Sequence, residues 1–294
     1  AGTYVMPLFD SDARLAFYAV SSSSNSQIAS AGALSVIGIG EVYGLRLVKP
    51  LAGLDNYFHT ATLGVDYKDF KENLNLIGAD GPESIDTPIS YLPFLVQYSG
   101  SLRGKESLTS FDLGLHFSMR GLGNEQEEFE NKRFLAKSNY MYLTGNVKFQ
   151  QDLPKGMELV SRFSGQVSDS PLISNEQFSI GGDESVRGYF ETQVLGDSGV
   201  FGSLELYSPH LGKTEWDYLN NLKALAFVDV AKSWIHNPLP DNSGGDFLSS
   251  AGFGLRFQMW NYLSGVLDIG FPLTSLAPVK SGDPRVHFKV AAEF

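Results

Sequence analysis

Apolar and polar residues alternate along most of this chain. Between residues 110 and 119 every second residue is apolar, and the apolar positions are Phe111, Leu113, Leu115, Phe117 and Met119. The last segment repeats the pattern, with Val286, Phe288, Val290 and Ala292 alternating with His287, Lys289 and Glu293. Successive side chains of a β-strand point to opposite faces. The pattern therefore predicts strands with one apolar and one polar face.

Thirteen segments fit such strands, with the length expected of a tilted strand that spans a membrane. They are residues 3–9, 14–22, 34–49, 57–71, 90–102, 107–120, 135–150, 157–168, 199–209, 221–233, 247–258, 262–273 and 285–294. Short turns such as residues 104–106 interleave with long polar stretches at 72–89, 121–134 and 168–198. Outer-membrane barrels show this alternation of tight turns and long outer loops.

The polar faces of these strands distinguish a membrane barrel from a soluble β-sandwich. They carry many charged residues, namely Asp66, Asp112, Arg162, Glu205, Asp229, Arg256 and Lys289. A dry sandwich core does not tolerate so many charges, whereas a water-filled lumen does. The aromatic end of the chain, Phe294, also resembles the C-terminal signal of outer-membrane barrels. We therefore expect an all-β fold, a transmembrane antiparallel β-barrel in the bacterial outer membrane.

The amino-acid composition excludes several other classes of protein and site. The chain has 294 residues, of which 43% are hydrophobic and 13% aromatic, yet no apolar run is long enough for a membrane helix. The net charge of −11 argues against binding to nucleic acid. Much of the acidity lies in loop-like stretches such as residues 125–130, which we expect to form a solvated loop. The absence of cysteine removes thiol chemistry and most zinc sites. No cofactor and no metal site are expected.

One motif differs from the alternating background. Residues 178–189 read Phe-Ser-Ile-Gly-Gly-Asp-Glu-Ser-Val-Arg-Gly-Tyr, inside the longest loop. The adjacent Gly181 and Gly182 permit a positive φ, so that this loop can fold back on itself. Arg187 is then a fixed cation that can reach an inward carboxylate. Asp229 is the leading candidate because its strand's alternation points it into the lumen, and Glu205 is a weaker second partner.

The motif resembles the signature of the outer-membrane assembly and two-partner secretion superfamily. Residues 172–178 before it and 196–199 after it are similar to the haemolysin-secretion (TpsB) branch, as are residues 4–8 and 44–51. The resemblance implies that the Arg of the loop pairs with the Asp of a Phe-x-Asp-x-Gly strand motif. Applied to this sequence, the resemblance implies a set of residues that hold the loop in place, here called the lock: Val186, Arg187, Gly188, Tyr189, Phe227 and Asp229. The loop backbone would also need Gly181 and Gly182. Ala231 departs from the pattern, which has Gly there.

The resemblance also implies a longer protein. Members of this branch have about sixteen strands, preceded by a plug helix and two periplasmic POTRA domains. An odd count of thirteen strands is unusual for a single-chain barrel. We therefore expect residues 1–294 to be the C-terminal barrel domain, with the first strands and the POTRA domains absent from this chain.

The function implied is export in two-partner secretion. A secreted protein of the adhesin or cytolysin class would cross the barrel, and the other expected partners are outer-membrane lipid and the barrel-assembly machinery. The alternatives within the superfamily are a barrel-assembly insertase and the barrel of a patatin-like fusion. An outer-membrane hydrolase is less favoured, because the five histidines are scattered without a catalytic pairing. A passive porin is a further alternative, but its function would not explain the presence of the motif at residues 178–189. We expect a transporter and not an enzyme.

Overall fold

The computed structural model describes residues 1–8, 12–22, 26–28, 34–36, 39–71, 73–76, 83–212, 219–238, 244–260 and 262–293. Of the sequence features singled out above, the terminal Phe294 lies outside these residues, as does the end of the first expected strand. Among the described residues, no helix is long and apolar enough to cross a membrane.

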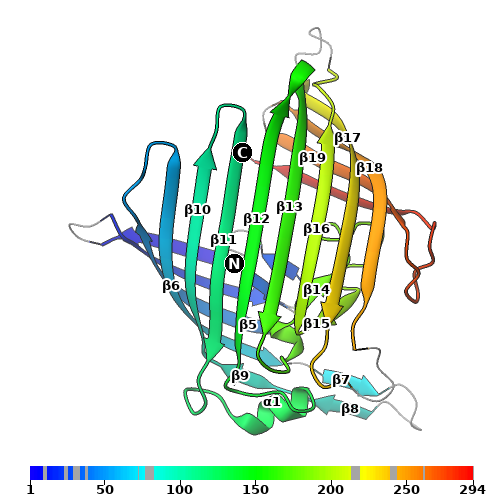
Figure 1. The fold of residues 1–294 in the computed structure, drawn as a ribbon. Helices are drawn as coiled ribbons and strands as arrows, with labels where there is room; N and C mark the ends of the chain where they lie inside the picture. The colour runs from blue at the N-terminus through cyan, green and yellow to red at the C-terminus, as the bar shows by residue number, and fades with distance from the viewer. Residues whose placement is uncertain are drawn as a thin grey trace. The chain divides into compact units, whose positions relative to one another are not determined.

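A single antiparallel sheet contains most of the strands (Figure 1). Its strands follow one another in chain order as β1 (Gly2–Pro7), β2 (Arg14–Ser22), β5 (Ile39–Pro50), β6 (Tyr57–Lys71), β10 (Pro93–Arg103), β11 (Ser107–Ser118), β12 (Met141–Leu153), β13 (Met157–Ser168), β16 (Ser198–Tyr207), β17 (Leu219–Trp234), β18 (Phe247–Met259), β19 (Leu263–Pro272) and β20 (Arg285–Ala292). The short β9 (Ile89–Tyr91) pairs with β6 beside this path. Each of the thirteen expected strands thus corresponds to one strand of the path, and the all-β antiparallel prediction is confirmed.

Three small hairpins and three short helices complete the described elements. The hairpins are β3 (Ser26–Ile28) with β4 (Leu34–Val36), β7 (Asn73–Leu76) with β8 (Glu83–Asp86), and β14 (Phe178–Ile180) with β15 (Val194–Gly196). The helices are α1 (Gln126–Lys132) and the 3-10 turns η2 (Pro154–Gly156) and η3 (Ser174–Glu176). The strand expected over 34–49 is therefore divided, because β4 belongs to a separate hairpin and β5 begins at Ile39.

Two sequence expectations around helix α1 are wrong in detail. The acidic run at 125–130 forms most of α1 instead of a solvated loop, because Phe129 is fully buried against the rings of Tyr91 and Tyr140. The strand expected from residue 135 begins only at Met141. Ala136 and Tyr140 are buried in the same apolar cluster, so this stretch packs against the helix and not into the ladder.

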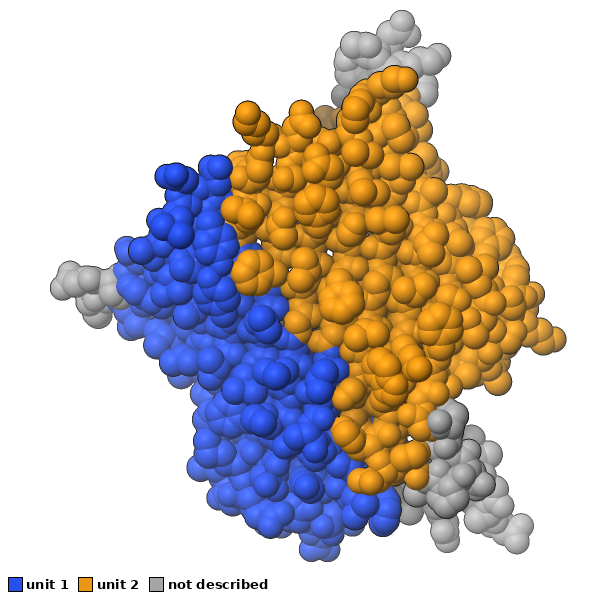
Figure 2. All heavy atoms as spheres, viewed as in Figure 1, with its two compact units in different colours: residues 1–100, 112–144, 166–177 blue, residues 101–111, 145–165, 178–294 orange. Residues whose placement is uncertain are grey.

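Two compact units divide the chain (Figure 2). Unit 1 comprises residues 1–100, 112–144 and 166–177, and its buried core gathers aromatic and aliphatic side chains around Tyr91 and Phe129. Unit 2 comprises residues 101–111, 145–165 and 178–294, and its core gathers Ile180, Val186, Tyr189 and Leu248.

The strands keep the two faces that the alternation predicts. On β20 the apolar Phe288 is 78% exposed. From Leu225 onwards the side chains of β17 alternate strictly, so that Phe227, Asp229 and Ala231 are buried while Val228 and Val230 are exposed. The exposed face is thus apolar and the covered face carries polar groups, which is the arrangement of a strand with lipid on one side.

Candidate functional site

The motif loop, residues 178–197, is a hairpin within unit 2. Strands β14 and β15 pair at its base, with Phe178 opposite Gly196 and Ile180 opposite Val194. Beyond the base, Gly181 has φ +104° and Gly182 has φ +101°, a region that residues with a Cβ rarely adopt. The chain turns back there, and the Gly181 amide donates to Ser185 Oγ over 2.8 Å. The two adjacent glycines thus allow the reversal that brings Arg187 towards the sheet.

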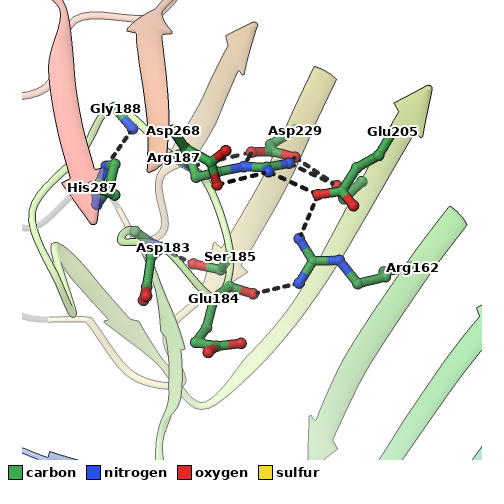
Figure 3. Close-up of polar contacts among 12 residues, drawn as sticks. Arg162, Asp183, Glu184, Ser185, Arg187, Gly188, Glu205, Asp229, Asp268 and His287 are labelled. Atoms are coloured by element: carbon green, nitrogen blue, oxygen red, sulfur yellow. Dashed lines mark hydrogen bonds and ion pairs between the residues drawn. The ribbon is translucent and has the colours of Figure 1, made fainter. Parts of the chain in front are cut away.

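Arg187 contacts Asp229 on β17 through one edge of its guanidinium, formed by Nε and Nη2 (Figure 3). Nε donates to Asp229 Oδ2 and Nη2 donates to Oδ1, each over 2.8 Å. The backbone amide of Arg187 also donates to Oδ2 over 3.2 Å. Arg187 is 1% exposed and Asp229 is 0% exposed. The expected contact is therefore present as a buried bidentate pair, a geometry that only an arginine can form with a carboxylate.

Two further carboxylates surround the guanidinium. Nη1 of Arg187 lies 2.7 Å from Glu205 Oε1 and 3.4 Å from Asp268 Oδ2. Arg162 in turn approaches Glu205 over 3.4 Å, and Arg256 contacts Asp268 over 2.6 Å. The cluster thus contains three cations and three anions, so that its buried charges balance.

The pKa of Arg187 reflects these neighbours. Burial alone would lower it, but the hydrogen bonds and charge of Asp229, followed by the charges of Glu205 and Asp268, hold the pKa above its ordinary value. The cation is therefore permanent and cannot be released by deprotonation.

Apolar and aromatic contacts hold the same loop. The guanidinium carbon of Arg187 lies 3.5 Å from the centroid of the Phe227 ring, a cation–π contact. Val186 and Tyr189 are fully buried in the unit 2 core. The Tyr189 hydroxyl lies 2.6 Å from the Thr274 carbonyl and 3.0 Å from the Ser249 carbonyl. All the residues expected for the lock therefore converge on one side of β17 to β19.

Ala231, the departure from the family pattern, lies inside this packing. It is buried in the same core as Val186 and Tyr189, and it pairs with Phe201 on β16 and Leu248 on β18. The methyl group is thus accommodated beneath the loop.

Four contacting residues were not predicted from the sequence. Asp268 and Gly270 lie on β19, His287 on β20 and Ser203 on β16. Asp268 shares the alternation phase of the covered face of β19, so its strand pattern could have identified it. Ser203 donates to Asp229 Oδ1 over 2.7 Å, and His287 Nε2 accepts from the Gly188 amide over 3.0 Å. These contacts depend on strand register, for which one sequence gives no signal.

A polar cavity of about 440 Å³ adjoins the cluster in unit 2. Its walls include Arg187, Glu205 and Asp268 from the cluster, and also Lys148, Glu158, Lys223 and Lys289 from the strands. Glu158 and Lys223 form an ion pair over 3.0 Å across it. A cavity lined by charges of both signs is wet and binds no single apolar ligand strongly.

The profile of the family described as haemolysin secretion/activation protein ShlB/FhaC/HecB matches residues 92–257. Among curated proteins, the outer membrane transporter CdiB of Dickeya dadantii (strain 3937) is 26% identical over 209 residues, which is 68% of this chain and 34% of that protein. CdiB of Escherichia coli is 23% identical over 208 residues, 64% of this chain and 34% of that protein. The chain thus spans about a third of the length of these relatives.

Solved structures share the fold. CdiB from Escherichia coli superposes with a TM-score of 0.68 at 20% identity, over 95% of this chain and 49% of the other. CdiB from Acinetobacter baumannii gives 0.67 at 15% identity, over 99% and 49%. BamA from Haemophilus ducreyi gives 0.61 at 16% identity, over 98% and 61%.

These similarities confirm two predictions from the sequence, a transmembrane antiparallel β-barrel and a resemblance to the two-partner secretion branch. The curated relatives named above are transporters of the outer membrane, which agrees with the expected location. This chain is a bacterial outer-membrane barrel that belongs to the haemolysin secretion/activation family of ShlB, FhaC and HecB.

Proposed function

We propose that this barrel is the pore through which an unfolded partner protein crosses the outer membrane in two-partner secretion, with the motif loop held in a fixed conformation by Arg187 and Asp229. The partner would be a large secreted protein of the adhesin or cytolysin class. The observation that carries the proposal is the fully buried bidentate pair beside a wet, mixed-charge cavity. Membership of a secretion family and the likeness to CdiB support it.

The physical argument concerns what a translocation path requires. An unfolded chain presents side chains of every kind, so its path must be polar and must not trap any one of them. Lys148, Lys289 and Glu158, charges of both signs, give the cavity such a lining. A loop beside this path must stay in place without closing it. A buried pair provides that rigidity, because loss of Arg187 leaves the buried Asp229 carboxylate without its cation.

The proposal extends to the whole protein. Further strands and two POTRA domains would complete it, the barrel would sit in outer-membrane lipid, and the barrel-assembly machinery would insert it. The likeness to BamA is one of fold, and an insertase function is the alternative.

Secretion assays test the proposal. The full-length protein carrying Arg187→Gln or Asp229→Asn should still appear in the outer membrane but should release at least about tenfold less partner, because a lost buried charge is worth several kcal/mol. Lys232→Gln is the matched control, since Lys232 lies on the exposed face of β17, the strand of Asp229, and does not line the cavity. Undiminished secretion by both loop variants would rule out the lock. Intact secretion together with defective assembly of other barrels would favour the insertase.

A further inference from the structure

A second buried ionic cluster lies just before the motif loop, within unit 1. It is centred on Glu176, the last residue of η3, which is 4% exposed. Its carboxylate accepts hydrogen bonds from Lys68 Nζ over 2.5 Å and from the Tyr91 hydroxyl over 2.6 Å at Oε1, and from the Tyr142 hydroxyl over 2.6 Å at Oε2. The three donors come from β6, β9 and β12. One carboxylate thus ties a loop residue to three strands.

The rest of the lead-in segment, residues 172–177, is fastened as well. Leu172 and Ile173 are buried in the unit 1 core. Arg133 Nη1 donates to the Leu172 carbonyl over 2.6 Å, and Gln166 Nε2 donates to the Glu176 carbonyl over 3.0 Å. The segment therefore contributes both apolar side chains and carbonyl groups to the core of unit 1.

The charge balance of this cluster differs from that around Arg187. Glu176 is one anion facing one cation, Lys68, whose ammonium also lies 5.6 Å from the centroid of the Tyr91 ring. Among the described residues, Lys68 forms no ion pair with a second carboxylate. Removal of either charge therefore leaves the other buried without compensation. Around Arg187, by contrast, one guanidinium faces three carboxylates, and two of these, Glu205 and Asp268, also contact Arg162 and Arg256.

The boundary between the two compact units falls between Gln177 and Phe178. The lead-in segment thus belongs to unit 1, while the motif loop that follows belongs to unit 2. Contacts of Glu176 and contacts of Arg187 share no residue. Substitutions at distant sites without shared partners usually have additive effects on stability.

We propose that Glu176 is a second positioning residue, which anchors the segment entering the motif loop to Lys68, Tyr91 and Tyr142 independently of the Arg187–Asp229 pair. The loop is then held at two points, and rupture of the arginine pair releases its tip while the lead-in segment stays in place. The consequence for secretion rests on the proposed function, but the anchor itself does not.

Hydrogen–deuterium exchange of the full-length protein in lipid nanodiscs separates the two anchors. Glu176→Gln should raise amide exchange in peptides covering 170–177 by about tenfold or more and leave 185–189 unchanged, and Arg187→Gln should do the reverse. The double variant Lys68→Met/Glu176→Gln, which leaves no unpaired charge, should exchange less than the sum of its single variants. It also keeps the test available where the single variant does not fold. Glu158→Gln is the matched control.

Three outcomes would overturn the proposal: unchanged exchange at 170–177 in Glu176→Gln, simultaneous opening of both peptides in either single variant, or additive effects in the double variant. Secretion of the partner is measured on the same variants. An exchange pattern as predicted with normal secretion in every variant leaves the anchor standing and contradicts the proposed function instead.

Discussion

Gly188 and Gly270 face each other where the motif loop meets strand β19, and neither has room for a side chain. A Cβ on Gly270 would lie 2.5 Å from the Gly188 nitrogen and 2.6 Å from the Arg187 carbonyl carbon. A Cβ on Gly188 would lie 3.0 Å from the Gly270 carbonyl group, and Gly188 has φ +95°. The backbones of the loop and the strand are therefore in direct contact at this point. The position of Arg187 depends on the absence of a side chain at Gly270.

Gly270→Ala should consequently displace the loop. The new methyl group meets main-chain atoms, which cannot rotate away, and overpacking of this kind costs about 1–3 kcal/mol. We expect a lower free energy of unfolding in urea and faster amide exchange at 185–189. Gly202→Ala on β16 is the control, because its Cβ would meet only a Val230 methyl at 3.7 Å. Equal behaviour of the two alanine variants would contradict this account of the contact.

Asp229→Asn should destabilise the barrel by about 3–5 kcal/mol, since it removes one charge of a buried pair. Arg187→Lys keeps the cation but cannot donate through two parallel N–H groups, so it should be destabilising also, by less. The free energy of unfolding in lipid vesicles measures both. Glu158→Gln in the more exposed Glu158–Lys223 pair should cost only about 0–1 kcal/mol. A cost for Asp229→Asn no larger than that of the control would show that the pair contributes little.

Tyr189→Phe should remove the hydroxyl that joins the motif loop to the Thr274 and Ser249 carbonyls. The Thr274 carbonyl loses this donor, whereas the Ser249 carbonyl still accepts from the Leu273 amide over 2.8 Å. A buried acceptor left without a donor costs about 1–3 kcal/mol. The ring keeps its place in the core, so the loss should appear as a lower unfolding free energy with an unchanged fold. Tyr67→Phe, at an exposed position of β6, is the control. Indistinguishable stability of the two phenylalanine variants would mean that the hydroxyl is not a fastening point.

Acid should loosen the lead-in segment. Burial would raise the pKa of Glu176, but the charge of Lys68 and the hydrogen bonds from Lys68, Tyr142 and Tyr91 outweigh it and lower that pKa. A lowered folded-state pKa contributes stability that is present above the ordinary glutamate pKa of about 4.3 and is lost as pH falls through the folded-state value. Amide exchange at 170–177, corrected for its intrinsic pH dependence, should therefore rise in that acidic window.

The same titration on Glu176→Gln isolates this group from other titrating side chains, including His116, which stacks on Tyr142. The variant should lack the acidic rise. A rise of the same size in both proteins would assign it to another group.

The strand content of this fold could be predicted because alternation is a local property. Phe111 to Met119 and Val286 to Ala292 show period two without any knowledge of their neighbours. The ends of strands were harder to predict where tertiary packing determines them. A strand was expected from residue 135, yet Ala136 and Tyr140 lie in one buried cluster with Phe129 of α1 and the ladder begins at Met141.

The candidate site could likewise be predicted only in part from the sequence. Arg187 stood out through its glycine-rich motif and Asp229 through its phase on a strand. Asp268 could have been found through its phase on β19. Gly270 was missed because its contact with Gly188 arises only when the motif loop packs on β19. Glu176 was missed because its partners Lys68, Tyr91 and Tyr142 lie far away in the chain.

Site-specific photo-crosslinking during secretion tests the central claim most directly. Lys148 and Val147 are neighbours on β12, but Lys148 lines the polar cavity while the Val147 side chain is 41% exposed and does not line it. A photoreactive residue placed at each position of the full-length protein reports what passes there. The account predicts that the secreted partner is captured from position 148 and not from position 147. Capture from neither position while secretion proceeds, or equal capture from both, would contradict a path along this cavity.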